Sequence, residues 1–289
     1  MEKNNKSFFI AELIISYVIF GTIGLFVRGI PLPSSVIAAF RGIVGAVLIF
    51  LFMLLTRRKV SLAEIKSNGG LLFFSGLAMG FNWIFLFEAY RYTSIATATL
   101  CYYMAPVFVV AAAPLFLRER LTLRGVICII AALFGMFLIS GASLGSRSDI
   151  YGVLLGLAAA LLYATVIICN KKMKPIAAET RALTQLFVAG TTVLPYTLLT
   201  ASLEEASFTA KGAILLVVVG VVHTGAAYVM SLGSMARVDA GTVAVLSYID
   251  PIVAILLEAA FINKQLPSLT VVLGAVLILG ATAVSSGKK

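Results

Sequence analysis

Long apolar stretches separated by short polar connections dominate this chain of 289 residues. A helix that crosses the hydrocarbon core of a bilayer needs about 20 consecutive, mostly apolar residues. Ten stretches meet that requirement, at 9–28, 34–56, 69–90, 94–117, 121–140, 151–169, 180–201, 210–231, 240–262 and 268–285. The connections between them leave no room for a soluble domain. The pattern therefore predicts an all-α membrane protein with ten transmembrane helices.

The second half of the chain repeats the first at a shift of 145 positions. In this register the paired residues include Gly80 with Gly225, Thr97 with Thr242, Tyr103 with Tyr248, Pro106 with Pro251 and Gly135 with Gly280. Such self-similarity indicates a duplicated structural unit. It divides the chain into residues 1–145 and 146–289, with five predicted helices each. Because five is odd, the two halves are expected to cross the membrane in opposite directions, as the inverted repeats of secondary transporters do.

Positive charge is distributed unevenly over the predicted connections. With the N-terminus inside the cell, the inner loops and ends hold Lys3, Lys6, Arg57, Arg58, Lys59, Lys66, Arg118, Arg120, Arg124, Lys171, Lys172, Lys174, Arg181, Arg237, Lys288 and Lys289. The outer loops hold only Arg28, Arg91, Arg147, Lys211 and Lys264. Cytoplasmic loops of membrane proteins carry such an excess of Lys and Arg. The bias predicts that both termini are cytoplasmic, and it explains the net charge of +10 without a nucleic-acid partner.

Composition and motifs narrow the functional class. The chain is 61% hydrophobic and 12% charged, with a mean hydropathy of +1.07. It has no Walker loop and no cluster of metal ligands, so we expect no cofactor or metal and disfavour an ATP-driven pump or a membrane enzyme. Cys101, Cys128 and Cys169 are too few and too scattered for a disulfide framework. The first helix lacks a convincing cleavage site and is expected to be retained.

Two blocks of the sequence carry a family resemblance. Residues 88–139, which read EAYRYTSIATATLCYYMAPVFVVAAAPLFLRERLTLRGVICIIAALFGMFLI, and residues 232–284 resemble the signature of the drug/metabolite transporter superfamily, EamA type. The second copy departs from it where RER at 118–120 becomes NKQ at 263–265. The resemblance implies a carrier in the bacterial inner membrane for small metabolites, amino acids or related amines, commonly exported. It also implies a central cavity lined by both halves, with the fourth and ninth helices prominent.

Asp250 is the most conspicuous polar residue within a predicted span. An ionisable side chain at the bilayer centre costs about 2.5–3.5 kcal/mol on insertion scales and usually faces a partner or water. Asp250 shares a helical face with Ser247 and Glu258, and Pro251 frees the carbonyl of Ser247 to accept from a ligand, water or side chain. Asp250 is predicted either to bind an ammonium group or carry a coupling proton, or to hold the bundle together by pairing with Arg41 or capping a broken helix.

Other polar residues inside the spans admit a functional and a structural role. Arg41 is suited to a substrate carboxylate, but could equally snorkel or pair with Asp250 or Glu88. Gln185 aligns with it in the second half at a shift of 144. His223 is predicted either to bridge helices in its neutral form or to carry a proton. Glu88, Glu258 and Glu12 lie nearer the membrane faces, where snorkelling is inexpensive.

Aromatic residues and prolines complete the candidate site. Residues expected near a cavity are Asn82, Trp83, Tyr17, Tyr102, Tyr103, Tyr163 and Tyr248. Each either packs against its neighbours or contacts a ligand, and buried tyrosines need partners for their hydroxyls. Pro106 and Pro251 are predicted hinges. Gly76-x-x-x-Gly80 and Gly152-x-x-x-Gly156 predict close helix contacts, which leave the choice between a monomer and a homodimer open.

Together these features predict a multi-pass carrier of the inner membrane. Its expected partners are a small-molecule substrate, the lipid bilayer and protons, and it works by alternating access between two inverted repeats. The alternative is a sensor or scaffold that retains the carrier fold without transporting anything. Asp250 favours the carrier, because a scaffold has little reason to keep an unpaired acid within the membrane.

Overall fold

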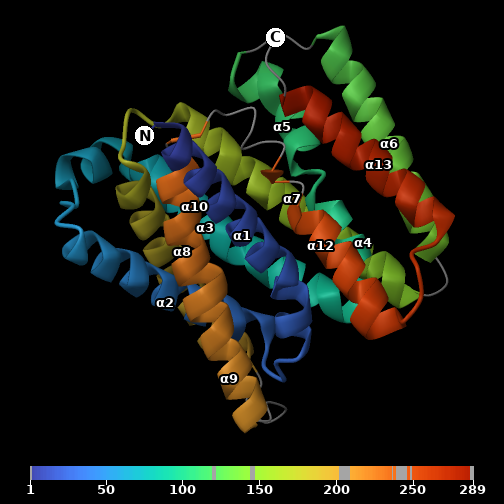
Figure 1. The fold of residues 1–289 in the computed structure, drawn as a ribbon, viewed down its shortest axis with the longest axis horizontal. Coiled ribbons are helices and arrows are strands. Elements are labelled where there is room, and N and C mark those ends of the chain that lie inside the picture. The colour runs from blue at the N-terminus through green and yellow to red at the C-terminus, as the bar shows by residue number, and fades with distance from the viewer. Residues whose placement is uncertain are drawn as a thin grey trace.

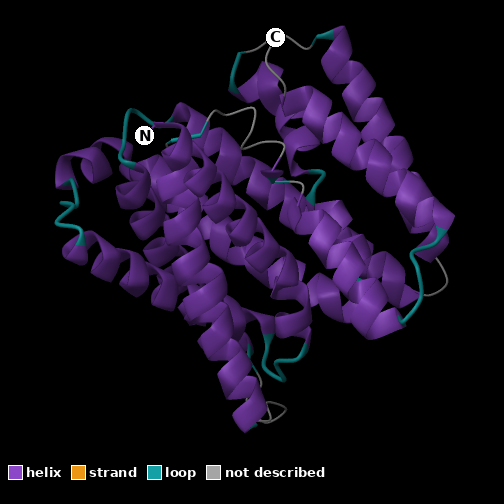
Figure 2. Ribbon diagram, viewed as in Figure 1, coloured by secondary structure: helices purple, strands orange, loops and turns teal. Residues whose placement is uncertain are grey.

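Helices build the part of the chain that this computed structural model describes, namely residues 2–118, 122–143, 147–201, 209–235, 237–238, 246–247 and 249–286 (Figures 1 and 2). Within these residues there is no strand. The helices of the first half are α1 (Glu2–Arg28), α2 (Ser34–Leu55), α3 (Leu62–Tyr92), α4 (Ile95–Tyr102), α5 (Ala105–Phe116) and α6 (Leu123–Ser143). Those of the second are α7 (Arg147–Lys172), α8 (Ala178–Thr200), α9 (Ala210–Val218), η1 (Val219–Ala226), α10 (Ala227–Met235), α12 (Ile249–Leu257), η2 (Glu258–Asn263) and α13 (Leu269–Ser286), where η marks a π-helix.

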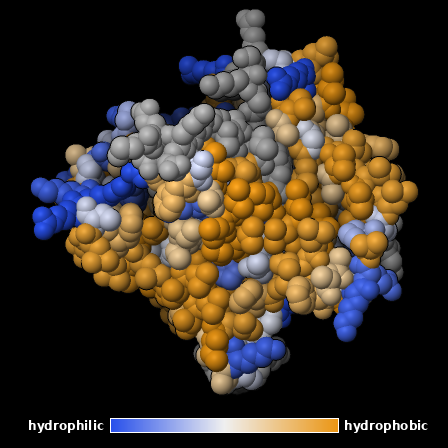
Figure 3. Space-filling view, in the orientation of Figure 1, coloured by the Kyte–Doolittle hydropathy of each residue, from blue (hydrophilic) through white to orange (hydrophobic). Residues whose placement is uncertain are grey.

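The apolar helices identify a multi-pass membrane protein. Among the described residues, seven stretches are long and apolar enough to cross a bilayer: Ser7–Arg28, Ser34–Leu55, Leu62–Tyr92, Ile95–Phe116, Ser148–Lys172, Ala178–Thr200 and Ala210–Leu232. Two shorter apolar helices, Leu123–Leu138 and Leu269–Ala281, accompany them. Figure 3 shows apolar residues covering most of one face, with hydrophilic residues gathered at its margins. Such a surface would be a liability in water and suits contact with lipid.

The internal repeat is visible in the helix boundaries. A shift of 145 places α1 over α7 and α2 over α8, and it places α6 over α13. The predicted helix at 94–117 is divided, however, because α4 ends at Tyr102 and α5 begins at Ala105. Pro106 lacks the N–H that would continue the helix, so the ladder is interrupted there. In the second half α12 begins at Ile249, just before Pro251. Both predicted hinge prolines therefore lie at the start of a helix.

Contacts between the halves follow a two-fold pattern. Two pairs of equivalent helices touch each other, α2 against α8 and α6 against α13, and α6 and α13 form a separate pair at one edge (Figure 1). The same shift of 145 places α3 over α9, η1 and α10. Accordingly, α3 packs on α7 as α10 packs on α1, and α3 packs on α8 as η1 packs on α2. Gly42 of α2 faces Gly190 of α8, and Arg58, just beyond the C-terminal end of α2, pairs with Glu179 in the first turn of α8, so these two helices are antiparallel. A two-fold axis that relates α2 to α8 must therefore be perpendicular to these two helices.

Glycines permit the closest of these contacts. Gly76 and Gly80 face Val188 and Val193 of α8, and Gly152 and Gly156 face Thr93 and Cys101. The sequence prediction that these spacings serve close helix packing is thus confirmed within one chain. At the crossing of α2 and α8, a Cβ placed on Gly42 would lie 2.6 Å from the backbone nitrogen of Gly190. Backbone cannot withdraw from such an overlap without moving a whole helix.

We expect Gly42→Ala to destabilise the protein, because the added methyl group overpacks a backbone contact at a cost of about 1–3 kcal/mol. The measurement is the apparent Tm in detergent micelles. Gly70→Ala is the matched control, since a Cβ at this helical position meets nothing within 4 Å. Equal Tm values for the two variants would contradict the proposed contact.

Candidate functional site

A cavity of about 450 Å³ lies between the two halves of the protein. Its volume is in the range of pockets that hold small molecules. Helices α1 to α5 contribute residues from the first half, and α7, α8, α10 and α12 contribute residues from the second. Ten of the predicted site residues line it: Tyr17, Arg41, Asn82, Trp83, Tyr102, Tyr103, Tyr163, Gln185, Ser247 and Asp250. The predicted hinge Pro106 lines it as well.

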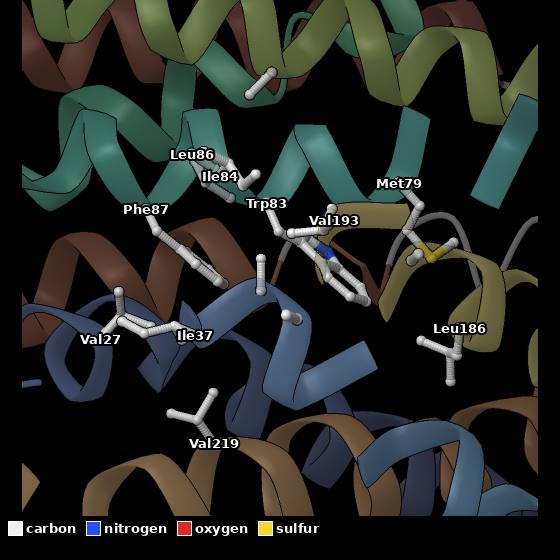
Figure 4. Packing of buried hydrophobic residues seen from close by; sticks show 14 of the residues in the cluster. Val27, Ile37, Met79, Trp83, Ile84, Leu86, Phe87, Leu186, Val193 and Val219 are labelled. Carbon is white, nitrogen blue, oxygen red and sulfur yellow. The ribbon is translucent and has the colours of Figure 1, made fainter. Parts of the chain in front are cut away.

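Arg41 supplies a fixed cation to this cavity. Its side chain is only 4% exposed, and Nε donates to Thr224 Oγ1 at 2.9 Å. The guanidinium lies over the ring of Trp83, 4.1 Å from the ring centroid, and 5.3 Å from that of Phe87. Both rings point from α3 toward α2 (Figure 4). Aromatic faces stabilise a desolvated cation without neutralising it.

Arg41 does not form the ion pair that the sequence offered as an alternative. Among the described residues, no salt bridge joins Arg41 to Asp250 or Glu88. Neither terminal guanidinium nitrogen has a hydrogen-bond partner in this part of the chain. The cation is buried, so snorkelling does not occur either. The two terminal nitrogens of a guanidinium can donate parallel hydrogen bonds, which match the planar geometry of a carboxylate.

Asp250 supplies a carboxylate from the opposite half of the molecule. Tyr103 Oη lies 3.2 Å from Asp250 Oδ2 and 3.0 Å from the carbonyl oxygen of Ser247, and it donates to this pair of acceptors. The Ser247 carbonyl is the one freed by Pro251, so the prediction that it accepts from a side chain is confirmed. The contact also joins the proline-broken α4–α5 segment to the proline-broken start of α12.

Tyrosines fill the space between the cation and the acid. Tyr90 and Tyr102 line the cavity together with Arg41 and Asp250. The ring of Tyr102 stacks on Tyr163 at 5.1 Å between centroids. An aromatic surface with hydroxyl groups at its rim suits a ligand with an apolar body and polar ends.

Amide side chains are held in place along the same cavity. Gln185 Nε2 donates to Ser75 Oγ at 2.7 Å and to Asn170 Oδ1 at 2.8 Å. Asn82 Nδ2 donates to the carbonyl oxygen of Ala159 at 2.6 Å, which ties α3 to α7. Asn82 Oδ1 is buried and has no partner within the described residues. Both amides are thus oriented by neighbouring helices rather than by a ligand.

Three predicted site residues lie away from the cavity lining. His223 is 1% exposed, lies 2.8 Å from Thr22 Oγ1 and packs on the ring of Phe26, so it bridges η1 to α1. Glu88 accepts from Ser34 Oγ at 2.5 Å and lies 3.8 Å from Arg91. Glu258 is 2% exposed and does not snorkel. Tyr248 lies outside the described residues.

Glu258 leaves the polar stripe that the sequence placed on one face of the ninth span. Glu258 does not line the cavity with Asp250, and α12 passes into the π-helix η2 at this residue. Its two carboxylate oxygens accept from the backbone N–H groups of Ile95, at 3.1 Å, and Ala96, at 2.5 Å. A carboxylate at a helix N-terminus satisfies unpaired donors and complements the helix dipole. Glu258 thus joins α12–η2 to α4 across the two halves.

The two ends of the cavity differ. At the Glu258 end, which also contains Glu88, the lining residues Phe87, Tyr90 and Thr99 are buried. At the other end, the Arg181 end, Arg181 and Asn170 are partly exposed, and Met235 is 38% exposed. The cavity therefore approaches the surface at the Arg181 end and is closed at the Glu258 end.

Sequence reasoning missed several lining residues. It counted Arg181 among the charges of the inner connections, whereas the structure places it inside α8 with its side chain on the cavity. The signal was present, because Arg181 precedes Gln185 by one helical turn and shares its face. Asn170, Tyr90, Thr99 and Ser231 were also missed. Nothing in a single sequence separates these residues from polar groups that bridge helices elsewhere.

The fold and the cavity define the class: a multi-pass helical membrane protein with a ligand-sized space between two related halves. The chain belongs to the EamA-like transporter family, whose model matches residues 8–141 and again residues 150–287. The two matches cover nearly all of the chain and confirm the resemblance noted in the sequence. Membership indicates a membrane transporter rather than an enzyme.

Curated relatives and a solved structure extend the likeness over the full length. An uncharacterized transporter, YxxF, of Bacillus subtilis (strain 168) is 28% identical over 289 residues, which is 99% of this chain and 91% of the relative. An uncharacterized transporter of Archaeoglobus fulgidus is 26% identical over 278 residues, 95% of each chain. A crystal structure with 19% sequence identity superposes with a TM-score of 0.67 over 97% of each chain, which shows the shared fold.

Proposed function

We propose that this protein is a secondary transporter that exports small metabolites, amino acids or related amines, across the inner membrane. It has ten transmembrane helices, arranged as two inverted five-helix repeats, with both termini in the cytoplasm. The observation that carries the proposal is the cavity between the halves, with Arg41 and Asp250 as separate, unlike charges. A zwitterion or an amine with an acidic group complements that pair.

The antiparallel crossing of α2 and α8 supports the inverted arrangement. Secondary transporters place their substrate site near the bilayer midplane, between inverted repeats, and exchange access by moving one half against the other. The broken helices at Pro106 and Pro251 are suited to such movement, because irregular backbone within a membrane is tolerated where it lines a cavity. The hydrogen bonds from Tyr103 to Ser247 and Asp250 join the two breaks.

The charge distribution supports export. The connections 56–61 and 173–177 lie at the Arg181 end of the molecule, and they carry Arg57, Arg58, Lys59 and Lys174. The positive-inside rule assigns this end to the cytoplasm. The cavity thus faces the cytoplasm in the described state and is positioned to receive a substrate there. Asp250 is the group that we expect to exchange a substrate amine or a proton during the cycle.

Flux measurements test the proposal directly. The purified protein in liposomes should transport members of a panel of amino acids and amines, and a pH gradient should change the rate or the extent of accumulation. Protein-free liposomes and liposomes with the denatured protein give the background. Absence of flux for every solute, with and without the gradient, would overturn the carrier proposal and favour a sensor or scaffold.

A further inference from the structure

Arg181 is a second cation on the cavity, and no role has been given to it so far. It occupies the first turn of α8, is partly exposed and lines the cavity at the end that approaches the surface. Within the described residues no carboxylate pairs with it. The nearest acid in sequence, Glu179, already forms an ion pair with Arg58. Arg181 therefore retains its donors at the mouth of the cavity.

Asn170 adds further donors beside the same mouth. Its Oδ1 accepts from Gln185 Nε2 at 2.8 Å, which leaves the two N–H groups of its own amide available. Gln185 follows Arg181 by one turn on the same face of α8. Gln185 and its partner Asn170 are therefore held near Arg181. Ser75 fixes Gln185 from α3. The mouth thus presents a guanidinium and an amide N–H group from two helices, a donor set that complements an oxyanion.

This donor set is separate from the Arg41 site. Gly42, the residue after Arg41, faces Gly190 of α8. Gly190 lies nine positions after Arg181 along this helix. At a rise of about 1.5 Å per residue, the two levels are about 14 Å apart. The cavity therefore holds two cationic levels along one path, with the amide of Gln185 between them.

We propose that Arg181 and Asn170 form a mouth subsite for the carboxylate of the substrate, occupied before that carboxylate reaches Arg41. This inference rests on the proposed transport function and adds a substrate-selecting step at the cytoplasmic mouth. A cation at a cavity mouth raises the local concentration of anionic ligands, and salt weakens the effect. The subsite selects for an acidic group and leaves amines without one unaffected.

The test has two parts. The first compares the binding of an amino acid with that of its decarboxylated amine, for example L-leucine and isopentylamine. The second measures transport kinetics from each face of oriented proteoliposomes. Arg181→Gln should raise KM for the amino acid about tenfold from the Arg181 face, the effect of losing a charged hydrogen bond. Vmax from the Arg181 face and KM from the Glu258 face should stay unchanged, and Vmax from the Glu258 face should fall by the same factor, because Vmax/KM of a carrier is equal from both faces in the absence of a gradient. Binding of the amine should not weaken. Arg181→Lys should restore much of the loss. Higher salt should reduce the difference between wild type and Arg181→Gln.

Lys59→Gln is the matched control, since it removes an exposed cation at the same end, outside the cavity. The subsite is overturned if Lys59→Gln raises KM as much as Arg181→Gln, or if Arg181→Gln raises KM equally from both faces. It is also overturned if amine binding weakens to the same degree. Each of these results leaves wild-type flux intact, whereas absence of flux in the wild type overturns the proposed function itself.

Discussion

Asp250→Asn is expected to abolish substrate flux or to uncouple it from a pH gradient. The substitution preserves the size of the side chain and an oxygen acceptor for Tyr103, but it removes the negative charge. Asp250 is the sole acidic residue among the described residues that line the cavity. The side chains that interact with it electrostatically are Tyr17, Tyr90, Tyr102, Tyr103 and Tyr163. Phenols remain neutral at physiological pH and cannot replace a carboxylate as proton carrier.

The measurement is accumulation of a transported amino acid in liposomes with and without an imposed pH gradient. Asp149→Asn provides the same chemical change in the first turn of α7, at a residue that does not line the cavity. It should retain wild-type flux and the same response to the gradient. Coupled transport at the wild-type rate by Asp250→Asn would eliminate the role assigned to this residue, whatever the substrate.

The contacts of Tyr103 allow the charge of Asp250 to be tested separately from the junction between the two halves. Its hydroxyl contacts both the Asp250 carboxylate and the Ser247 carbonyl, so the acid is one part of a junction between the halves. In Asp250→Asn the Ser247 contact remains, and the junction is expected to persist without the charge. An unchanged apparent Tm together with lost coupling would therefore separate a functional from a structural role.

The sequence predicted the bundle well because its signals were local and periodic. Apolar length predicted the seven stretches of the described residues that are long and apolar enough to cross a bilayer, and the shift of 145 gave the equivalence of α1 with α7 and of α2 with α8. Neither the apolar length nor the repeat could show that α4 and α5 are separate helices, since Pro106 permits either a kink or a break. They also could not predict that Glu258 binds the N-terminus of α4 and does not line the cavity, because that depends on how α4 packs against α12.

The cavity was predicted in part, for a physical reason. Arg41, Asp250 and Trp83 are expensive or conspicuous inside a membrane, so their types alone identified them. His223 was equally conspicuous, yet it bridges η1 to Thr22 of α1. Whether a polar side chain faces a cavity or a neighbouring helix depends on its rotation about the helix axis, and that rotation is set by packing between helices. Gly42 against Gly190 is an example of the contacts that decide it.

Glu258→Gln is expected to open the Glu258 end of the cavity. The carboxylate accepts from two backbone N–H groups of α4, and a glutamine has only one acceptor oxygen to replace both. Its amide N–H₂ would then face an unpaired backbone donor. Hydrogen bonds to charged groups contribute about 1.5–3 kcal/mol, so losing one shifts a two-state equilibrium about tenfold or more. The position equivalent to Glu258 in the first half is Ala113, so no acid can form the corresponding contact there.

Labelling of a single cysteine measures this opening. Thr99→Cys lines the cavity at the closed end, and the native Cys101, Cys128 and Cys169 are replaced by alanine. A membrane-impermeant maleimide added from the outer side should react several-fold faster when Glu258→Gln is present. Glu88→Gln is the matched control, because Glu88 binds Ser34 and joins two helices of the same half. Equal labelling with and without Glu258→Gln, or an equal rise in Glu88→Gln, would show that the contact with α4 does not close this end.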